Sequence, residues 1–188
     1  TPDDAMAVAL SVEGRLAACR RDTGALLYAH DAHGGGGTAL AGQSVNLAVV
    51  LDFSAHCRRI LEIDPVRRVA RVEPGVVLDQ LNAAAAAHGL MFGPDVATSS
   101  HATLGGMIGN NSAGAWSIRY GRTVEHLRSV DVLLAAGTPL HLGPGGAAAD
   151  PRVRALVEQV AEVVLPLSGE IRRRYPRIRR PLDCDNLD

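Results

Sequence analysis

Glycine in this chain is concentrated in two segments, and the first of them spans residues 34–44 with the sequence GGGGTALAGQS. Its consecutive glycines let successive backbone N–H groups point into one concavity that suits phosphate oxygens, and the missing Cβ atoms permit close approach. The G-x-G-x-x-G spacing of a Rossmann fingerprint is absent, and no helix pattern begins at the last glycine. Because apolar runs of strand length bracket the segment, the pattern favours a ligand cradle over a flexible surface loop.

The second segment begins with Gly93-Pro94-Asp95 and continues as TSSHATLGGMIGNNSAG over residues 98–114. Small residues alternate here with amides and hydroxyls, which would line a narrow slot and offer donors and acceptors to a flat or phosphorylated ligand. Alternatively, these glycines have a purely structural role and lie where helices contact each other. That alternative explains some of the glycines but not the density of polar side chains.

The composition indicates a folded chain and excludes several enzyme classes. With 188 residues, one domain or at most two small subdomains are expected, and 47% hydrophobic with 21% charged residues is typical of globular proteins. The net charge of −1 gives no global attraction to nucleic acid or to an anionic membrane. All 19 basic residues are arginines. The lack of lysine excludes a Walker-type phosphate loop, a Schiff base and a pyridoxal site.

Cysteine and histidine provide no pattern for a metal or a disulfide framework. Cys19, Cys57 and Cys184 are too few and too far apart for either, so a reducing, cytoplasmic location fits best. Among seven histidines only His30 and His33 lie close together, and no acidic residue completes a known ligand spacing. No apolar run reaches the length of a membrane span. Because the chain begins without Met, we expect it to have been cut from a longer protein.

The first third of the chain is expected to form a helix followed by two strands. Thr1 can cap a helix that Gly24 would end, and the acidic residues after Pro2 suit the positive end of its dipole. Residues 25–29 and 47–53 are apolar runs of strand length on either side of the first glycine-rich segment.

The remainder is expected to mix strands and helices without regular βαβ alternation. Residues 60–63 and 67–73 flank the turn signal Asp64-Pro65, which predicts a hairpin. Helical spacing of apolar residues predicts a helix over 77–88, ended by Gly89. Further along, the sequence predicts a buried strand over residues 130–135, a flexible loop over 143–146 and an amphipathic helix over 151–164. This order predicts an α+β domain of one or two subdomains rather than a doubly wound sheet.

Several longer motifs carry a resemblance to a known family. They are GGGGTALAGQSVN, VVLDFSAHCRRILEIDP, VEPGVVLDQLN, HGLMFGPD, ATLGGMIGNNSAG, SIRYGRTVEHL and the terminal RYPRIRRPLDCDNLD. Together they resemble the FAD-binding domain of the vanillyl-alcohol-oxidase-type (PCMH) flavoproteins. They are most similar to the branch of FAD-linked D-lactate dehydrogenases and glycolate oxidase subunits. The reductase of UDP-N-acetylmuramate synthesis shares glycine-rich loops but not the block from IGNNSAG to RYGRTVEHL.

The resemblance implies an α+β, two-subdomain PCMH-type FAD-binding fold, truncated at both ends, with residues 1–188 forming one partial domain. It implies that the FAD pyrophosphate is cradled by Gly35, Gly36, Gly37, Thr38, Gly42, Gln43 and Ser44. The residues that would pass along the flavin are Pro94, Asp95, Thr98, Ser99, Ser100, His101 and Ala102. The isoalloxazine and ribityl slot would be lined by Gly105, Gly106, Gly109, Asn110, Asn111, Ala113 and Gly114. Because Thr38 stands where some relatives carry a flavin-tethering His, the FAD is expected to be non-covalent.

The resemblance also implies oxidation of a small D-2-hydroxy acid, such as D-lactate or glycolate. The family's first strand would lie ahead of Thr1, and its substrate cap, catalytic His and any metal ligands would lie beyond Asp188. The segment that closes the adenine end would also follow the Asn-Leu-Asp motif. The family usually has an Arg before its Gly-Gly-Gly-Thr, whereas this chain has Gly34 there, preceded by His33, which weakens the charge at the pyrophosphate. We therefore expect no turnover from the isolated chain, and its catalytic residues remain unassigned.

The sequence also fits other interpretations. Residues 172–180 hold six of the 19 arginines, which would suit a nucleic-acid-binding module, although only Tyr175 provides an aromatic ring there. A non-catalytic FAD-binding subunit of a larger complex is a third interpretation, and peripheral attachment to the inner membrane is an alternative location. His101 fits either a proton shuttle or a polar wall. Trp116 and Tyr120 fit either ring stacking or core packing.

Overall fold

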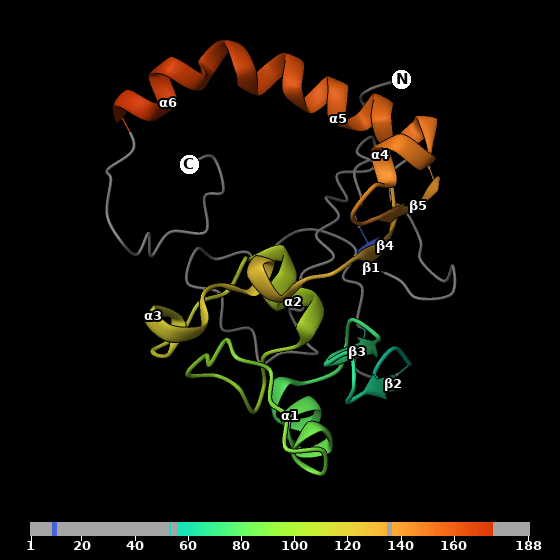
Figure 1. Ribbon diagram of the computed structural model, residues 1–188, viewed down its shortest axis with the longest axis vertical. Helices are drawn as coiled ribbons and strands as arrows, with labels where there is room; N and C mark the ends of the chain where they lie inside the picture. Colours follow the sequence, from blue (N-terminus) through green and yellow to red (C-terminus); the bar gives the residue numbers. More distant parts are fainter. Residues whose placement is uncertain (1–8, 11–52, 54–55, 135–136, 175–188) are drawn as a thin grey trace, which may run out of the picture.

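Figure 1 shows the computed structural model of the chain, which describes residues 9–10, 53, 56–134 and 137–174. The strands are β1 (Ala9–Leu10), β2 (Ile60–Asp64), β3 (Val69–Val72), β4 (Val130–Leu133) and β5 (Pro139–Leu142). The α-helices are α1 (Leu78–Ala86), α2 (Leu104–Gly109), α3 (Ser117–Tyr120), α4 (Gly146–Ala149), α5 (Pro151–Val164) and α6 (Ser168–Arg174). Two 3-10 helices, η1 (Thr123–His126) and η2 (Leu165–Leu167), complete the described elements. The α+β class is therefore confirmed, because all described strand pairs are antiparallel.

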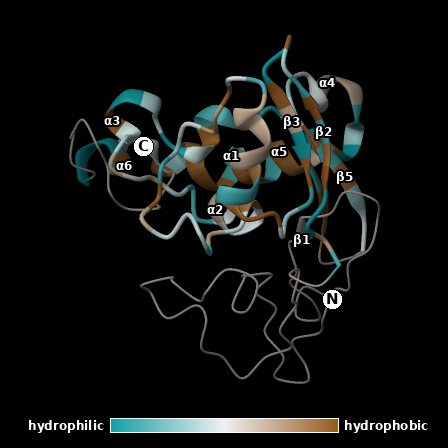
Figure 2. Ribbon diagram, turned by 90° about the horizontal axis from the view of Figure 1, so that it is seen from below, coloured by the Kyte–Doolittle hydropathy of each residue, from teal (hydrophilic) through white to brown (hydrophobic). Residues whose placement is uncertain are grey.

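The predicted hairpin is present as the antiparallel pair β2–β3. Asp64 Oδ1 accepts hydrogen bonds from the backbone N–H groups of Val66 and Arg67, each at 2.9 Å, which closes the turn after the strand. Asp64 pairs with Val69, and Ile60 pairs with Val72 at the other end. Figure 2 shows hydrophilic residues interrupting the hydrophobic ones along both strands, as expected for a sheet with one solvated face.

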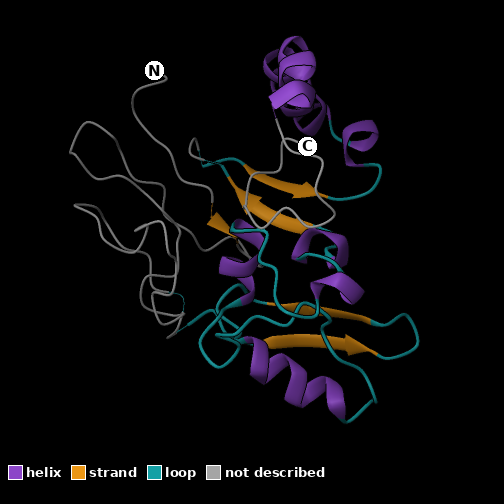
Figure 3. Cartoon of the chain, turned by 90° about the vertical axis from the view of Figure 1, so that its left-hand side faces the viewer, coloured by secondary structure: helices purple, strands orange, loops and turns teal. Residues whose placement is uncertain are grey.

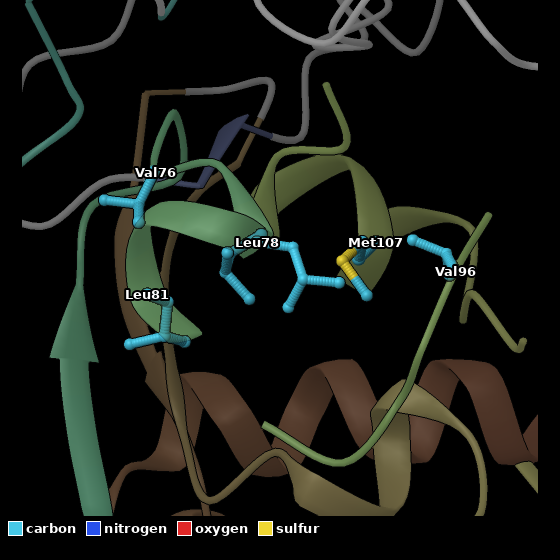
Figure 4. Packing of buried hydrophobic residues seen from close by; sticks show 6 residues of the cluster. Val76, Leu78, Leu81, Val96 and Met107 are labelled. Carbon is cyan, nitrogen blue, oxygen red and sulfur yellow. The ribbon is translucent and has the colours of Figure 1, made fainter. Parts of the chain in front are cut away.

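The predicted helix over 77–88 is present as the shorter α1. Val77 is its N-cap, and Gln80 Oε1 accepts from the Val77 N–H at 3.2 Å. Gly89 follows with φ +67°, a left-handed conformation that ends the helix. The first core cluster forms on the buried face of α1. It consists of Val76, Leu78, Leu81, Val96, Leu104 and Met107, most of which are labelled in Figure 4.

The second core cluster lies under α5, whose bounds match the predicted helix. Asp150 caps the helix by accepting from the Arg152 N–H at 2.8 Å, and Pro151 occupies the first position. Val153 is buried against Val132 of β4 and Leu140 of β5. Figure 3 shows the resulting stack, with α1 and β2–β3 at one end and β4–β5 with α5 at the other.

Two predicted elements need correction. Ala9–Leu10 was expected inside a helix but is strand β1, which pairs with Val132 and Leu133 of β4. Pairing to a strand far along the chain overrides local helix signals in that position. Gly146 was expected in a loop but begins α4, where the Asp150 N–H donates to the Gly146 carbonyl at 2.8 Å.

The other predictions for the first third of the chain lie outside the described residues, except at Phe53. That residue is buried but is not in a strand, and its carbonyl accepts from the Cys57 N–H at 3.1 Å. The predicted strand over 130–135 is present as β4, whereas β5 was not predicted. The sheet order is β1-β4-β5.

The C-terminal helices leave the second core and form an arch in Figure 1. Val153 at the start of α5 is 4% exposed, whereas Val157, Val160 and Val163 are 52%, 55% and 66% exposed. Among the described helices, none has the length and apolar character needed to cross a membrane.

Candidate functional site

The second glycine-rich segment lies against the residues that precede α1. Leu104 donates its N–H to the Val76 carbonyl at 2.8 Å, and Leu78 donates to the Ala102 carbonyl at 2.9 Å. Val77 and Thr103 form an antiparallel bridge between these bonds. The first N–H groups of both helices are therefore occupied by the opposite segment, which fixes α1 and α2 relative to each other.

Gly105 is required by packing at this junction. Its N–H donates to the Pro74 carbonyl at 2.8 Å, and a Cβ added to it would lie 2.7 Å from Pro74 Cβ. The Gly106 N–H is directed to Thr103 Oγ1 at 3.4 Å, so Thr103 caps α2. A Cβ on Gly109, at the other end of α2, would meet no heavy atom within 4 Å. Gly105 and Gly109 of α2 therefore occupy different environments.

Gly114 permits the closest backbone approach in this region. A Cβ on Gly114 would lie only 1.2 Å from the carbonyl oxygen of Asp95. Its N–H donates to Ser117 Oγ at 2.7 Å, which ties it to the start of α3. The structure thus brings together two parts of the predicted slot, at residues 94–96 and at Gly114.

The asparagine-containing turn after α2 is held by η1. Asn111 is buried with φ +47°, and its Oδ1 accepts from the Val124 N–H at 3.0 Å. The Ser112 carbonyl accepts from the Thr123 N–H at 3.1 Å and from Thr123 Oγ1 at 2.8 Å. Thr123 is 1% exposed. These bonds place residues 122–124 directly beside the polar positions that the sequence predicts to line the slot.

Arg122 begins this adjoining segment and was not among the predicted site residues. Its backbone N–H donates to Glu125 Oε1 at 2.9 Å, and its Nε lies 3.8 Å from the same oxygen. Within the described part of the chain, Arg122 NH1 is the buried side-chain nitrogen or oxygen that has no hydrogen-bond partner. Buried donors are nearly always paired in native proteins, so this one calls for an explanation.

Aromatic rings gather near α3. Trp116 is 53% exposed, and its ring centroid lies 6.3 Å from that of Tyr120. The prediction that Trp116 packs in the core is therefore wrong, whereas its stacking on a ligand ring stays a prediction. The Arg119 guanidinium lies 5.4 Å from the Tyr120 centroid. His126 contacts Phe92 with ring centroids 5.5 Å apart.

The buried carboxylate of Glu73 fixes the start of the Pro74–Val77 region. Glu73 is 3% exposed and accepts from three groups of Arg59: the backbone N at 2.7 Å, Nε at 3.0 Å and NH2 at 2.7 Å. The side-chain hydrogen bonds from Arg59 lower the pKa of Glu73 from its usual 4.5, against the opposing effect of burial. The pair holds the segment that carries Pro74 against residues 57–59.

The predicted cradle of the first glycine-rich segment, residues 35–44, lies outside the described residues. Within the second segment Thr98 accepts through its carbonyl from the His101 and Ala102 N–H groups, each at 2.8 Å, and Ser99 accepts from the Asp79 N–H at 3.2 Å. His101 is exposed, and its Nδ1 lies 2.8 Å from Ser100 Oγ. The ligand-contacting roles assigned to this segment remain predictions.

Helix α2 itself was missed at the sequence level. A cap residue, Thr103, stands before apolar residues at helical spacing, Leu104, Met107 and Ile108, which is a start signal for a helix. The glycines between them obscured that signal, since glycine disfavours a helix interior.

The remaining charged groups of the described residues provide no second site. No three His, Cys, Asp or Glu side chains gather there as a candidate metal site. In the arginine-rich run, Arg173 and Arg174 of α6 both pair with Glu170. That pairing reduces the positive charge of the portion of the run that the structure describes.

Comparison with known proteins gives one family match and several relatives. The family of FAD binding domains matches residues 32–143. The chain is 38% identical over 155 residues to D-2-hydroxyglutarate dehydrogenase of Pseudomonas putida, a match that covers 79% of this chain and 15% of the relative. It is 37% identical over 110 residues to glycolate oxidase subunit GlcD of Escherichia coli, covering 58% of this chain and 22% of the relative. It is 38% identical over 109 residues to D-lactate dehydrogenase of Archaeoglobus fulgidus, covering 58% of this chain and 24% of that protein.

Proposed function

Because the chain belongs to the family of FAD binding domains, we propose that it is the FAD-binding part of an oxidoreductase that oxidises a small D-2-hydroxy acid. One observation carries the proposal: the family match over residues 32–143 includes both glycine-rich segments. FAD is therefore the cofactor. The matches cover between 15% and 24% of the length of the three relatives. The activity of the whole protein is therefore proposed to need residues that are not in this chain.

We propose a PCMH-type domain with two subdomains, comprising residues 1–188. The two core clusters support this division, because one is built on α1 and α2 and the other on β4, β5 and α5. The first would lie near the flavin, since it is formed beside the second glycine-rich segment.

The pyrophosphate cradle is proposed for residues 35–38 and 42–44. Consecutive glycines present backbone N–H groups to phosphate oxygens, and this requires that no Cβ intervene. Replacing Gly36 with Val should therefore reduce FAD affinity far more than it reduces the unfolding free energy. Unchanged affinity of Gly36→Val in a flavin fluorescence titration would show that the cradle is misplaced.

The flavin slot is proposed for the small and polar residues between Pro94 and Gly114, whereas Leu104 and Met107 of the same segment belong to the first core cluster. The chemistry of the described residues fits a flavin nucleotide, because residues with hydroxyl and amide side chains flank both ends of α2 and the guanidinium of Arg122 holds a buried N–H without an acceptor. Binding is proposed to be non-covalent, with Thr38 at the tether position. Acid precipitation should leave the flavin in the supernatant, and flavin retained in the protein pellet would refute this.

The substrate class is supported by the relatives' names, all three of which refer to 2-hydroxy acids or their oxidation. The match to the D-2-hydroxyglutarate dehydrogenase covers 79% of this chain, against 58% for the other two, which makes D-2-hydroxyglutarate the first acid to test. Bound FAD would supply an acceptor for the hydride that leaves C2 when a base deprotonates the hydroxyl and the acid becomes a 2-oxo acid. The residues of this chain would bind and orient the flavin for that step.

The test uses anaerobic mixing with D-2-hydroxyglutarate, D-lactate or glycolate. A longer protein that contains this chain should lose its flavin absorbance with one of these acids. The 188-residue chain loaded with FAD should not, because the base and substrate pocket are proposed to lie elsewhere. Failure of the longer protein to bleach with any 2-hydroxy acid would refute the substrate class.

A partner subunit is a second element of the proposal. One relative is by name a subunit of glycolate oxidase, which supports assembly with another chain. Cytoplasmic location remains part of the proposal. Co-purification of a tagged full-length protein with a stoichiometric second subunit would support assembly, and a monomer in sedimentation would contradict it.

A further inference from the structure

The guanidinium of Arg122 is held in place by its own segment. Gly121 precedes it with φ +79°, and Thr123 and Val124 follow with hydrogen bonds to Ser112 and Asn111. The Glu125 carboxylate lies 3.8 Å from Arg122 Nε. One edge of the guanidinium therefore faces an anion, and the backbone on both sides of the residue is anchored.

The other edge has no such partner. Arg122 NH1 is enclosed by the protein, although 28% of the side chain as a whole remains exposed. A buried donor of a charged group that lacks an acceptor is destabilising, and the penalty is larger than for a neutral group. An arrangement of this kind persists where a ligand supplies the acceptor, as at sites that are preorganised for a charged partner.

The neighbours of Arg122 indicate what that ligand is. Its segment is hydrogen-bonded to Asn111, one of the residues proposed to line the flavin slot, and to Ser112, which follows it. FAD carries acceptor oxygens in its pyrophosphate, its ribityl chain and its isoalloxazine carbonyls. Arginine suits such oxygens because it keeps its charge and presents several N–H donors in a fixed plane.

We propose that Arg122 is an FAD-binding residue whose NH1 donates a charge-assisted hydrogen bond to an oxygen of the bound flavin nucleotide. This rests on the proposed function, because it requires the slot to lie beside residues 111–114. It adds a cation to a site whose predicted residues carry no positive charge.

The experiment measures FAD affinity and unfolding of the FAD-free 188-residue chain for the wild type, Arg122→Gln and Arg122→Lys. Loss of one charge-assisted hydrogen bond should weaken FAD binding by about 10- to 100-fold in Arg122→Gln. Arg122→Lys keeps the charge but loses the planar donor set, so an intermediate loss is expected. The FAD-free Arg122→Gln protein should unfold at the same temperature as the wild type or higher, because the unpaired donor is removed.

Arg119→Gln is the matched control. This arginine lies on α3 near the same segment, is exposed and contacts the Tyr120 ring, so its replacement should leave FAD affinity unchanged. Titrations with riboflavin and FMN identify the oxygen that accepts the hydrogen bond. If Arg122→Gln also weakens the binding of riboflavin, that oxygen lies on the ring or the ribityl chain. If it weakens only the binding of FMN and FAD, the oxygen belongs to a phosphate. Both results support the proposal.

Wild-type FAD affinity in Arg122→Gln, with a lowered unfolding temperature of the FAD-free protein, would overturn it and leave Arg122 as a structural partner of Glu125. If the wild-type chain itself shows no saturable FAD binding, the proposed function fails as well. The two failures are therefore distinguished by the wild-type titration.

Discussion

Gly109 and Gly114 lie five positions apart in the same polar segment, yet the space around their Cα atoms differs completely. A Cβ on Gly114 would overlap the Asp95 carbonyl oxygen at 1.2 Å, whereas a Cβ on Gly109 would meet nothing within 4 Å. Both were predicted to line the flavin slot, because the composition of the segment does not distinguish one glycine from the other. Only the packing separates a glycine that the fold requires from one that it tolerates.

Gly114→Ala should therefore destabilise the protein by about 1–3 kcal/mol or more, because residues 95–96 must move to admit the methyl group. Gly109→Ala should leave the unfolding free energy unchanged or raise it by up to about 1 kcal/mol, because alanine favours the helix. Urea unfolding followed by circular dichroism measures both. Equal stability of the two variants would contradict the close approach at Asp95.

Glu73 provides a residue-level prediction about pH. Its folded-state pKa lies below the usual 4.5, chiefly because of hydrogen bonds from the Arg59 side chain. The carboxylate thus contributes stability above the unfolded pKa, and that contribution is lost as the pH falls through the folded pKa. Glu73→Gln should be less stable than the wild type near neutral pH, and the difference should shrink as the medium is acidified below about 4.5.

Urea unfolding at several pH values between about 7 and 3 tests this. Glu158→Gln on exposed α5 is the control, and its unfolding free energy should remain within about 0.5 kcal/mol of the wild type throughout. A stability difference for Glu73→Gln that does not vary with pH would show that the Arg59 pairing is not the cause.

Among the secondary-structure elements, the sequence predicted the turns and helix ends that are determined by residues at the boundary itself. The turn at Asp64, the helix after Asp150 and the stop at Gly89 each follow from side chains or glycine at the boundary. Strands β1 and β5 were missed, because a short strand is stabilised by its partner and carries little pattern of its own. Arg122 was missed for a similar reason, since its proposed role in FAD binding depends on contacts of its segment with the turn at Asn111 and Ser112.

Helix α5 yields a prediction that separates burial from helix propensity. Val153 and Val160 lie in the same helix, but Val153 is 4% exposed and Val160 is 55% exposed. Val153→Ala should cost about 1–3 kcal/mol through lost contacts with Val132 and Leu140. Val160→Ala should change the unfolding free energy by less than about 0.5 kcal/mol. Similar losses at both positions would mean that the far half of α5 is also packed.

For the molecule as a whole, two core clusters and the family match give a consistent account. The first cluster fixes α1, α2 and the Pro74–Val77 region beneath the proposed flavin slot, and the second supports β4, β5 and α5. The sequence-level resemblance predicted the family and the cofactor, both of which the match over residues 32–143 confirms. It could not predict how the slot is braced, because the Glu73–Arg59 pair and the Gly114–Asp95 approach arise only from tertiary packing.

Binding of FAD by this chain, through the proposed pyrophosphate cradle and flavin slot, can be measured by calorimetric titration with FAD and FMN. We expect saturable binding of one FAD per chain, with FMN bound at least about 10-fold more weakly because it lacks the second phosphate and the adenosine. Absence of saturable FAD binding would show that this chain is not an FAD-binding domain by itself, and equal affinity for FMN would show that the proposed cradle has no role in recognition.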